Sequence, residues 1–257
     1  MKWVASESWF MRPARAVRRL FAGPSSASSA WNSGLADEQA FWDRWLGAAD
    51  SPGFRFRVDP TSPLQPWIES WMDPSRSVQR IIDVGSGPLS VLGRRSAIGT
   101  IEISCCDPLA REYQLLLERH HIAPPHTVLA VAGEALSSYF PRGHFDVSFS
   151  NNAIDHAQDP LLVLREMALV TRPGGAIIVQ VADREGRRAS YTGLHQWDCS
   201  MDEGRFAVAA RNSQAIDVAM ALADLVEPAL IERVSVSPAG IPWDPSHIRA
   251  VFLRKNC

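Results

Sequence analysis

The chain has 257 residues, of which 46% are hydrophobic and 21% charged, and its formal net charge is −2. This length suits one α/β domain, alone or with a small cap, and gives enough chain to bury a core. The near balance of 26 basic and 28 acidic residues provides no overall attraction to phosphate backbones, so no nucleic-acid partner is expected. No apolar stretch is long enough to span a bilayer.

The cysteines and the N-terminus indicate the compartment. Cys105, Cys106, Cys199 and Cys257 form no CxxC pair, and two of them fall in or beside an expected buried strand. Neither a disulfide framework nor a structural zinc site is therefore expected. Because the N-terminus also lacks an apolar region of secretory length, we expect a cytoplasmic protein.

Residues 1–36 form a basic extension that is rich in serine and alanine. Five basic side chains stand against the single acid Glu7, and a Ser/Ala/Gly-rich run covers residues 22–34. Such a segment is typical of an organelle-targeting peptide, of an interfacial helix or of a leader that packs loosely. We favour the loosely packed leader.

Residues 37–75 carry seven Phe and Trp side chains, interrupted by four prolines. Phe41, Trp42 and Trp45 have the spacing of one helix face, but the prolines forbid a long helix in the rest of the segment. We expect an aromatic-rich helical cap. Its rings either pack onto a neighbouring core or line a ligand pocket and exclude water from it.

Residues 76–257 carry the pattern of an α/β domain. Apolar runs at residues 80–84, 101–106, 126–132, 145–149 and 176–181 read as strands separated by helices. Asp107-Pro108 and Asp159-Pro160 each offer an acidic N-cap followed by proline at the first helical position. This order predicts a parallel, doubly wound sheet. Two late runs, 230–236 and 247–253, are compatible with a terminal hairpin.

Candidate ligand-binding residues follow each of the first four strands, at the edge where such sheets bind ligands. After the first strand, Gly85 and Gly87 let the chain turn sharply and bring bare backbone against a ligand. Asp107 stands 20 residues beyond Gly87, where an acid could accept hydrogen bonds from both ribose hydroxyls of an adenosine. It could equally cap the helix that Pro108 begins, and the two roles are compatible.

Taken together, these places resemble the class I S-adenosylmethionine-dependent methyltransferases over residues 79–181. Asp83, Gly85 and Gly87 match the glycine-rich motif that cradles the methionine part of the cofactor, although Leu89 replaces its frequent third glycine. Asp107 matches the acid that holds the ribose. The run 145–156 and the later Arg172-Pro173-Gly174-Gly175 are similar to the small-molecule branch of the family.

The resemblance implies a Rossmann-like, seven-stranded, mostly parallel sheet with an antiparallel last strand. It also implies S-adenosylmethionine as cofactor and an oxygen or nitrogen of a small molecule as methyl acceptor. The residues that it assigns to the cofactor are Asp83, Gly85, Ser86, Gly87, Asp107, Pro108, Gly133, Glu134, Ala135, Asn151 and Asn152.

Two other functions stay open. A non-catalytic or regulatory protein could retain the same cofactor pocket. An NAD-dependent oxidoreductase is disfavoured, because its glycine motif would prefer glycine where Ser90 stands and its fold lacks the late hairpin.

The candidate catalytic residues are Asp155 and His156, after the fourth strand, and His195, in an insertion at residues 191–198. An oxygen acceptor needs to lose a proton, and an imidazole or a carboxylate can take it. We expect the acceptor between the aromatic cap, the turn at residues 152–156 and this insertion, with Trp197 beside it. No histidines have metal-ligand spacing, so no metal is expected. The sequence leaves the acceptor and the oligomeric state open.

Overall fold

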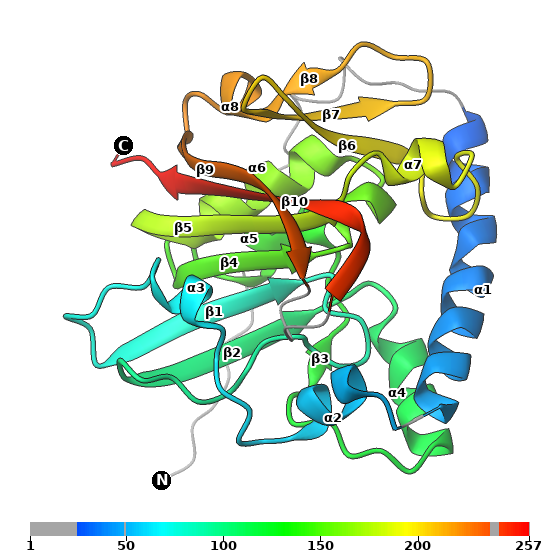
Figure 1. The fold of residues 1–257 in the computed structure, drawn as a ribbon, viewed down its shortest axis with the longest axis horizontal. Helices are drawn as coiled ribbons and strands as arrows, with labels where there is room; N and C mark the ends of the chain where they lie inside the picture. Colours follow the sequence, from blue (N-terminus) through cyan, green and yellow to red (C-terminus); the bar gives the residue numbers. More distant parts are fainter. Residues whose placement is uncertain (1–24, 49, 237–241, 257) are drawn as a thin grey trace, which may run out of the picture.

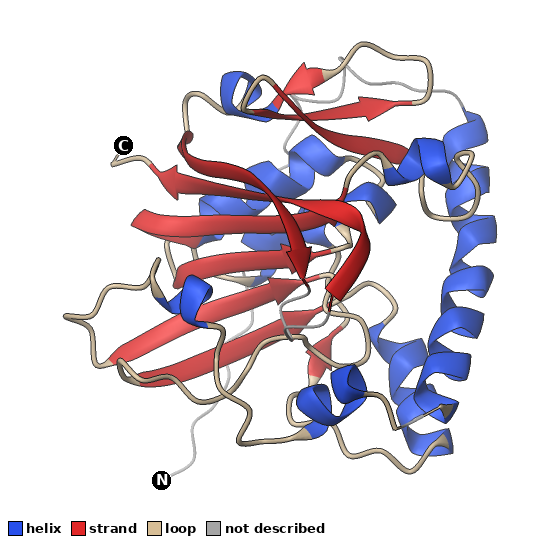
Figure 2. Cartoon of the chain, viewed as in Figure 1, coloured by secondary structure: helices blue, strands red, loops and turns tan. Residues whose placement is uncertain are grey.

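The computed structural model describes residues 25–48, 50–236 and 242–256, so the expected leader at residues 1–24 lies outside this part of the chain. A seven-stranded sheet with helices on both sides forms the body, and a three-stranded sheet packs beside it (Figure 1, Figure 2). No helix in the described ranges is long and apolar enough to cross a membrane.

The main sheet confirms the expected architecture. Its strands are β1 (Val78–Val84), β2 (Thr100–Cys106), β3 (Val128–Leu129), β4 (Phe145–Asn151), β5 (Thr171–Ala182), β9 (Val226–Val236) and β10 (Pro242–Arg254). They lie in the order β3-β2-β1-β4-β5-β10-β9. The first five pair in parallel, whereas β10 runs antiparallel to both β5 and β9. This late hairpin is the feature that a nicotinamide-binding domain would lack.

Successive side chains of the central strands enter two different cores. Ile82 and Ile177 belong to the cluster that packs under α6 (Pro160–Val170), and Ile81 and Ile178 to the cluster on the other face. Because strand side chains alternate between faces, both faces of the sheet are buried. The edge at which the parallel strands end is therefore the place left for polar chemistry.

The strand β4 differs from the half-buried pattern that its alternation indicates, because its polar residues are buried as well. Asp146 accepts hydrogen bonds from the Arg80 backbone at 2.8 Å and from Arg172 Nε at 2.6 Å. The Ser148 hydroxyl lies 2.7 Å from that of Thr171. Partners of this kind remove the cost of burying polar groups.

The expected alternation of strands and helices fails between β1 and β2. Residues 85–99 form turns without a helix, because Gly85, Gly87, Pro88, Gly93 and Gly99 interrupt the segment. The segment at Leu64 and Gln65 covers this stretch instead, and Gln65 Nε2 donates to the Val91 carbonyl at 2.8 Å.

The two helices with expected acidic caps differ at their first residues. Asp159 caps α6 as expected, and its Oδ1 accepts from Leu162 N at 3.0 Å. The other helix, α4 (Ala110–Arg119), begins three residues after Asp107, with Leu109 at the cap position. The third strand is also shorter than expected, since only two residues of this sheet edge pair with β2.

The second sheet was not anticipated. It consists of β6 (Trp197–Asp202), β7 (Arg205–Ala210) and β8 (Ile216–Asp217), and its Cys199, Phe206 and Val208 join the core under α6. Glu203 and Gly204 connect β6 to β7 with positive φ angles of 50° and 73°. Two such residues between alternating strands are the signature of a tight hairpin.

The remaining helices are short, except for α1 (Ser25–Gly47), which stands across the edge of the sheet at which β1 ends (Figure 1). They are α2 (Pro52–Val58), α3 (Pro66–Glu69), α5 (Leu136–Tyr139), α7 (Glu185–Arg188) and α8 (Val218–Ala221), together with the single turns η1 (Gly133–Ala135) and η2 (Ile154–His156).

Helix α1 runs through the boundary expected at residues 36 and 37. The expectation of loose packing is wrong for the last part of the extension, since a Cβ on Gly34 would lie 2.5 Å from the Gly193 backbone. The aromatic cap also divides in two. Trp42 and Trp45 pack with α4, whereas Trp67 packs on the far face of the sheet, against Phe149.

The packing of α1 on α4 yields a stability prediction. Leu46 is fully buried between the two helices, whereas Leu115 of α4 is 64% exposed. Leu46→Ala should lower the free energy of unfolding by about 2–5 kcal/mol, because it leaves a cavity in a packed core. Leu115→Ala should change that energy by less than about 0.5 kcal/mol. Urea unfolding of both variants measures the difference, and equal losses would show that α1 is not anchored at this point.

Candidate active site

A cavity of about 500 Å³ lies at the carboxyl ends of the parallel strands and is covered by α1. The four strand-end places singled out in the sequence all line it. Among the lining residues that the sequence reasoning missed are Trp31, Leu35 and Glu38 of α1, Arg57, Ala132, Glu185, Arg188 and His247. The helical spacing of Trp31, Leu35 and Glu38 was the signal that could have revealed the α1 contribution.

The glycine turn after β1 has no room for side chains. Gly85 and Gly87 have φ angles of 70° and 63°, in the left-handed region that favours glycine. A Cβ on Gly85 would lie 2.4 Å from the Ala153 Cβ, and one on Gly87 would lie 2.7 Å from the Trp42 ring. The turn thus brings bare backbone to the cavity wall, with Ser86 buried beside it.

Asp107 faces this turn from the end of β2. Its Oδ2 accepts from Gly87 N at 3.1 Å and its Oδ1 from Leu109 N at 2.9 Å. Burial raises the pKa of Asp107 to about 7, helped by the charges of Glu38 and Asp83 and opposed by the two backbone donors. Each carboxylate oxygen accepts one backbone hydrogen bond and can accept another, so two hydroxyl donors of a ligand could still bind to it. Pro108 lines the cavity next to it.

Asp83 lies deeper, at the end of β1, and accepts a hydrogen bond from Ser90 Oγ at 2.6 Å. Burial raises the pKa of Asp83 to about 6, although Ser90 and Arg57 oppose the shift. Arg57 is itself buried, which lowers its pKa to about 10. Its guanidinium lies over the Trp42 and Trp45 rings and donates to the Leu89 carbonyl. Arg57, from the segment expected to form the cap, thus helps to hold the chain that follows the glycine turn.

Only some of the candidate residues that follow β3 reach the cavity. Gly133 and Glu134 line the cavity, whereas Ala135, expected beside them, does not. Glu134 Oε1 accepts from Gln158 N at 2.9 Å and from Asp159 N at 3.3 Å, so this carboxylate ties η1 to the start of α6.

The residues after β4 lie at the centre of the cavity. Asn152 has a φ of 49°, and its Oδ1 accepts from Ala182 N at 3.1 Å, which joins the ends of β4 and β5. Its Nδ2 lies 3.2 Å from His247 Nε2. Asn151 presents a buried Oδ1 that has no hydrogen-bond partner in the protein. An orphaned acceptor that lines a cavity indicates a ligand donor.

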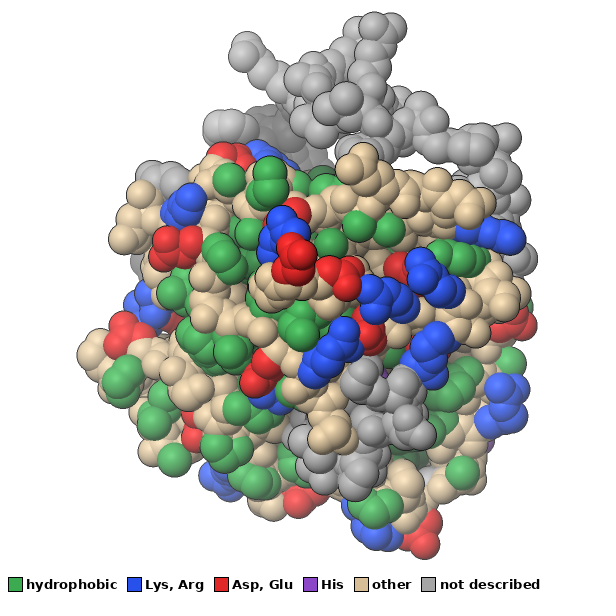
Figure 3. All heavy atoms as spheres, turned by 45° about the horizontal axis from the view of Figure 1, so that its top comes forward, with side chains coloured by type: hydrophobic (Ala, Val, Ile, Leu, Met, Phe, Trp, Pro, Cys, Tyr) green, Lys and Arg blue, Asp and Glu red, His purple; other side chains and the backbone are tan. Residues whose placement is uncertain are grey.

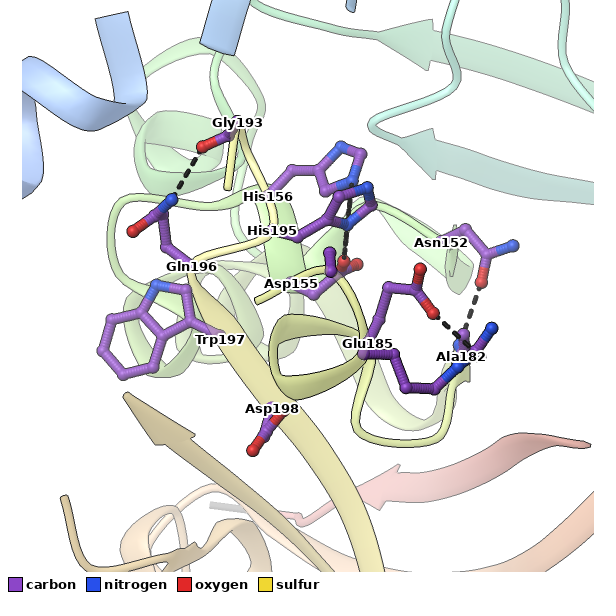
Figure 4. A network of polar contacts seen from close by, with 12 residues as sticks. Asn152, Asp155, His156, Ala182, Glu185, Gly193, His195, Gln196, Trp197 and Asp198 are labelled. Atoms are coloured by element: carbon purple, nitrogen blue, oxygen red, sulfur yellow. Dashed lines mark hydrogen bonds and ion pairs between the residues drawn. The ribbon is translucent and has the colours of Figure 1, made fainter. Parts of the chain in front are cut away.

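Asp155, His156 and His195 form the polar end of the cavity (Figure 4). His195 Nδ1 lies 2.8 Å from Asp155 Oδ2 and 3.1 Å from His156 Nε2. His156 Nε2 lies 3.5 Å from the same carboxylate oxygen. The structure thus brings together three candidate catalytic side chains from two separate segments of the chain.

The charges of this cluster support one another. Burial alone would raise the pKa of Asp155, but the neighbouring His156 and His195 hold it below its usual value. Partial burial alone would lower the pKa of His195, yet the hydrogen bond and charge of Asp155 raise it, with help from Glu185 and Glu38. Asp155 and His195 thus behave as an ion pair at the cavity wall.

Helix α1 and the insertion at residues 191–198 enclose the cluster. Trp31 Nε1 donates to the His156 carbonyl at 2.8 Å, and Trp42 Nε1 donates to Glu38 Oε1 at 2.8 Å. Trp197, expected beside the acceptor, does not line the cavity. Its ring points away from the two imidazoles, and its Nε1 donates to the Ala157 carbonyl at 2.9 Å (Figure 4).

Residues 82–179 match the methyltransferase-domain family. A tRNA U34 carboxymethyltransferase of Saccharophagus degradans is 28% identical over 133 residues, which are 51% of this chain but only 38% of that protein. The N-methyltransferase NodS of Bradyrhizobium japonicum, solved with S-adenosylhomocysteine, superposes with a TM-score of 0.52 at 15% identity, covering 88% of this chain and 100% of NodS. The 1,6-didemethyltoxoflavin-N1-methyltransferase of Burkholderia thailandensis superposes with a TM-score of 0.48 at 12% identity, covering 92% of both chains.

The superposition on NodS supports a shared fold, which in this chain has an antiparallel β10 between β5 and β9. The matched segment also contains the glycine turn, Asp107 and the polar residues after β4. The domain match and the sheet order together identify residues 82–179 as part of a methyltransferase domain with the class I fold.

Proposed function

We propose that the enzyme transfers the methyl group of S-adenosylmethionine to an oxygen or nitrogen atom of a small molecule. The observation that carries this proposal is that one cavity of about 500 Å³ is lined at one end by the glycine turn and Asp107 and at the other by the Asp155 cluster. That volume lies within the range of small-molecule pockets.

The residues of the cofactor end fit the cofactor. Asp107 and the orphaned Asn151 Oδ1 can accept from donors that the protein itself does not supply. The turn at Gly85 and Gly87 leaves its backbone open to the methionine part, and Gly133 with Glu134 lines the adenine side. When bound, S-adenosylmethionine supplies a methyl group on a positively charged sulfur, and its carbon–sulfur bond breaks with the electron pair staying on sulfur.

The residues of the other end fit an acceptor. Trp31, Leu35, Phe41 and Leu194 provide apolar walls that exclude water, and the Asp155 cluster provides the polar group. Holding the acceptor in line with the methyl carbon accounts for much of the rate in such a displacement. In this proposal Asp155, His156 and His195 activate the acceptor by removing its proton.

A transfer RNA is the second candidate acceptor, since the 133-residue match is to a tRNA-modifying enzyme. Two observations favour a small molecule instead. The net charge is −2, and basic side chains on the face shown in Figure 3 are interleaved with acidic ones. A protein that binds RNA tightly gathers basic side chains into a patch. We place the reaction in the cytoplasm, because Cys105, Cys106 and Cys199 are buried free thiols.

The acceptor class is tested by isotope transfer. The enzyme is incubated with methyl-labelled S-adenosylmethionine and either the low-molecular-weight ultrafiltrate of a cell extract or purified tRNA. We expect label in a small molecule of the ultrafiltrate. Label in tRNA alone would overturn the small-molecule assignment, and no label in either fraction would contradict turnover.

The raised pKa of Asp107 predicts that cofactor binding releases a proton. In the free protein this carboxyl is largely protonated below pH 7, whereas ribose hydroxyls bind best to its charged form. Affinity for S-adenosylhomocysteine should therefore be about tenfold weaker at pH 6 than at pH 8. Calorimetry in buffers of different ionisation enthalpy measures both the affinity and the released proton.

Asp107→Asn provides the control for this titration. The variant should bind more weakly, by about 1.5–3 kcal/mol for hydrogen bonds to a charged group. Its affinity should also lose most of the change between pH 6 and 8, since burial raises the pKa of Asp83 only to about 6 and that of Asp107 to about 7. A variant with the pH profile of the wild type would assign the proton to another residue.

The proposed role of the polar cluster predicts a separation of binding and turnover. His195→Ala should lower the rate of methyl transfer by about 10²–10⁴, the usual contribution of acid–base catalysis. Affinity for S-adenosylhomocysteine should stay within about twofold of the wild type, because His195 lies outside the cofactor end. Trp197→Phe is the matched control, since Trp197 neighbours the cluster in sequence but not in the cavity. Equal rates in both variants would refute the assignment.

A further inference from the structure

Asp155, His156 and His195 present one atom each to a common point at the cavity wall. All three of these atoms lie within 4.8 Å of one another, and their separations are 2.8, 3.1 and 3.5 Å. Bonds of about 2.0–2.2 Å from one ion to nitrogen and oxygen keep neighbouring ligand atoms about 2.8–3.6 Å apart, at angles between octahedral and tetrahedral. The observed triangle has this size.

Hydrogen bonding alone does not explain the arrangement. The Nδ1–H of His195 can point at Asp155 Oδ2, but His156 Nε2 lies 3.1 Å from the same nitrogen and 3.5 Å from the same oxygen, so one proton would have to be shared among three atoms. The two rings have centroids 4.5 Å apart and planes at 74°, so their nitrogen-bearing edges meet and they do not stack. A single proton forms a good hydrogen bond between two atoms, whereas a metal cation can accept a lone pair from each of the three.

The atoms around His156 orient it as a ligand. Its Nδ1 faces Glu38 Oε2 at 4.0 Å, while Trp42 Nε1 holds the other oxygen of that carboxylate. The ring is thus turned so that Nε2, and not Nδ1, points into the cluster. Metal-bound histidines usually direct their other ring nitrogen to a carboxylate or carbonyl in this way.

The cluster is open on the cavity side. The Asp155 side chain is only 3% exposed, whereas those of His156 and His195 are 20% and 35% exposed, and all three line the cavity. Around the cavity, the carboxylates of Glu38, Asp83, Asp107, Glu134, Asp155 and Glu185 face the guanidiniums of Arg57 and Arg188. This excess of acidic groups favours a cation.

We propose that Asp155 Oδ2, His156 Nε2 and His195 Nδ1 form a binding site for a divalent first-row transition-metal ion, and that this ion coordinates the methyl acceptor. Two histidines and one carboxylate leave coordination positions free for a substrate atom. The sequence expectation of no metal overlooked this site, since positions 155, 156 and 195 have no ligand spacing along the chain.

A bound metal ion would also decide between an oxygen and a nitrogen acceptor. With the ion bound, the three side chains hold the ion and do not take the proton themselves. A coordinated hydroxyl loses its proton to solvent more readily and keeps lone pairs with which to form the bond to the methyl carbon. A coordinated amine would give up its only lone pair to the metal. The site therefore selects an oxygen acceptor. This role rests on the proposed function, whereas metal binding itself does not.

The binding test uses the full chain, stripped with a chelator and dialysed, without cofactor or acceptor. Zn²⁺ titration should show one ion per chain. His156→Ala, His195→Ala and Asp155→Ala should each weaken Zn²⁺ binding by at least about 100-fold, since loss of an outer-shell partner already costs 10–100-fold. His120→Ala is the matched control, because His120 pairs with Asp43 at 2.7 Å without a third ligand and should leave binding unchanged.

Two further measurements keep the test decisive if a variant does not fold. Co²⁺ bound to the wild-type protein should show visible absorption of nitrogen and oxygen coordination, without the intense near-ultraviolet band of thiolate ligands. Affinity for S-adenosylhomocysteine reports whether each variant retains its fold. Substoichiometric Zn²⁺ uptake, a thiolate spectrum, or folded variants that bind Zn²⁺ as the wild type does would each overturn the site.

The activity arm separates this inference from the proposed function. Methyl transfer by the wild type should fall at least tenfold in the stripped protein and return with added metal ion. Zn²⁺ binding without methyl transfer to any small molecule would contradict the proposed function and leave the site intact. Full transfer by the stripped protein would overturn the role of the ion and leave the methyltransferase function intact.

Discussion

Parallel pairing of β1, β2, β4 and β5, with both sheet faces buried, governs where this protein can do chemistry. Apolar side chains fill both faces of the sheet. Polar side chains that have no hydrogen-bond partner within the sheet therefore lie where the strands end. Asp83 is the last but one residue of β1, Asp107 directly follows β2, and Asn151 is the last residue of β4. Their common edge becomes a cavity because the chain turns away there through glycines and short helical turns.

An edge of this kind stays open to water unless another element covers it, and α1 supplies the cover. The C-terminal part of α1 is anchored by Leu46 and Trp42 in the cluster shared with α4, and its middle by Gly34 against the Gly193 backbone. The same helix contacts both ends of the cavity. Trp42 lies against Gly87 at the end proposed for the cofactor and holds Glu38, which faces His156 at the end proposed for the acceptor. A shift of α1 relative to the sheet would therefore alter both ends of the cavity at once.

Carboxyl groups at the two ends experience opposite environments. Asp83 and Asp107 have few partners, and burial raises their pKa values, whereas the imidazoles beside Asp155 hold its pKa low. An acid whose pKa is raised on folding stabilises the folded state less as pH rises through that value. The free protein thus gives up stability near neutral pH at Asp83 and Asp107, and ligand donors at Asp107 can offset the loss. Separated pKa values of like groups are a common property of active sites.

Local signals in the sequence determined much of this protein. The strands were recognisable from apolar runs, because strands buried on both faces carry apolar side chains on both. Gly85, Gly87 and Asp107 were recognisable because they belong to a short motif within about 25 residues of the chain. The sequence did not predict the β6–β7–β8 sheet, the absence of a helix after β1 or the reach of α1 over the cavity. Those features depend on contacts between distant segments, such as Gln65 with Val91 and Gly34 with Gly193.

The polar cluster shows the same division between local and distant information. Residue type and position after β4 were enough to single out Asp155 and His156, and the insertion after β5 singled out His195. Their meeting at 2.8–3.5 Å required β5, α7 and the start of β6 to return the chain over the end of β4. Sequence by itself determined which groups this protein has at its strand ends. Only the tertiary structure decided that three of them share one point, since the separation of two side chains in space depends on packing that no local pattern encodes.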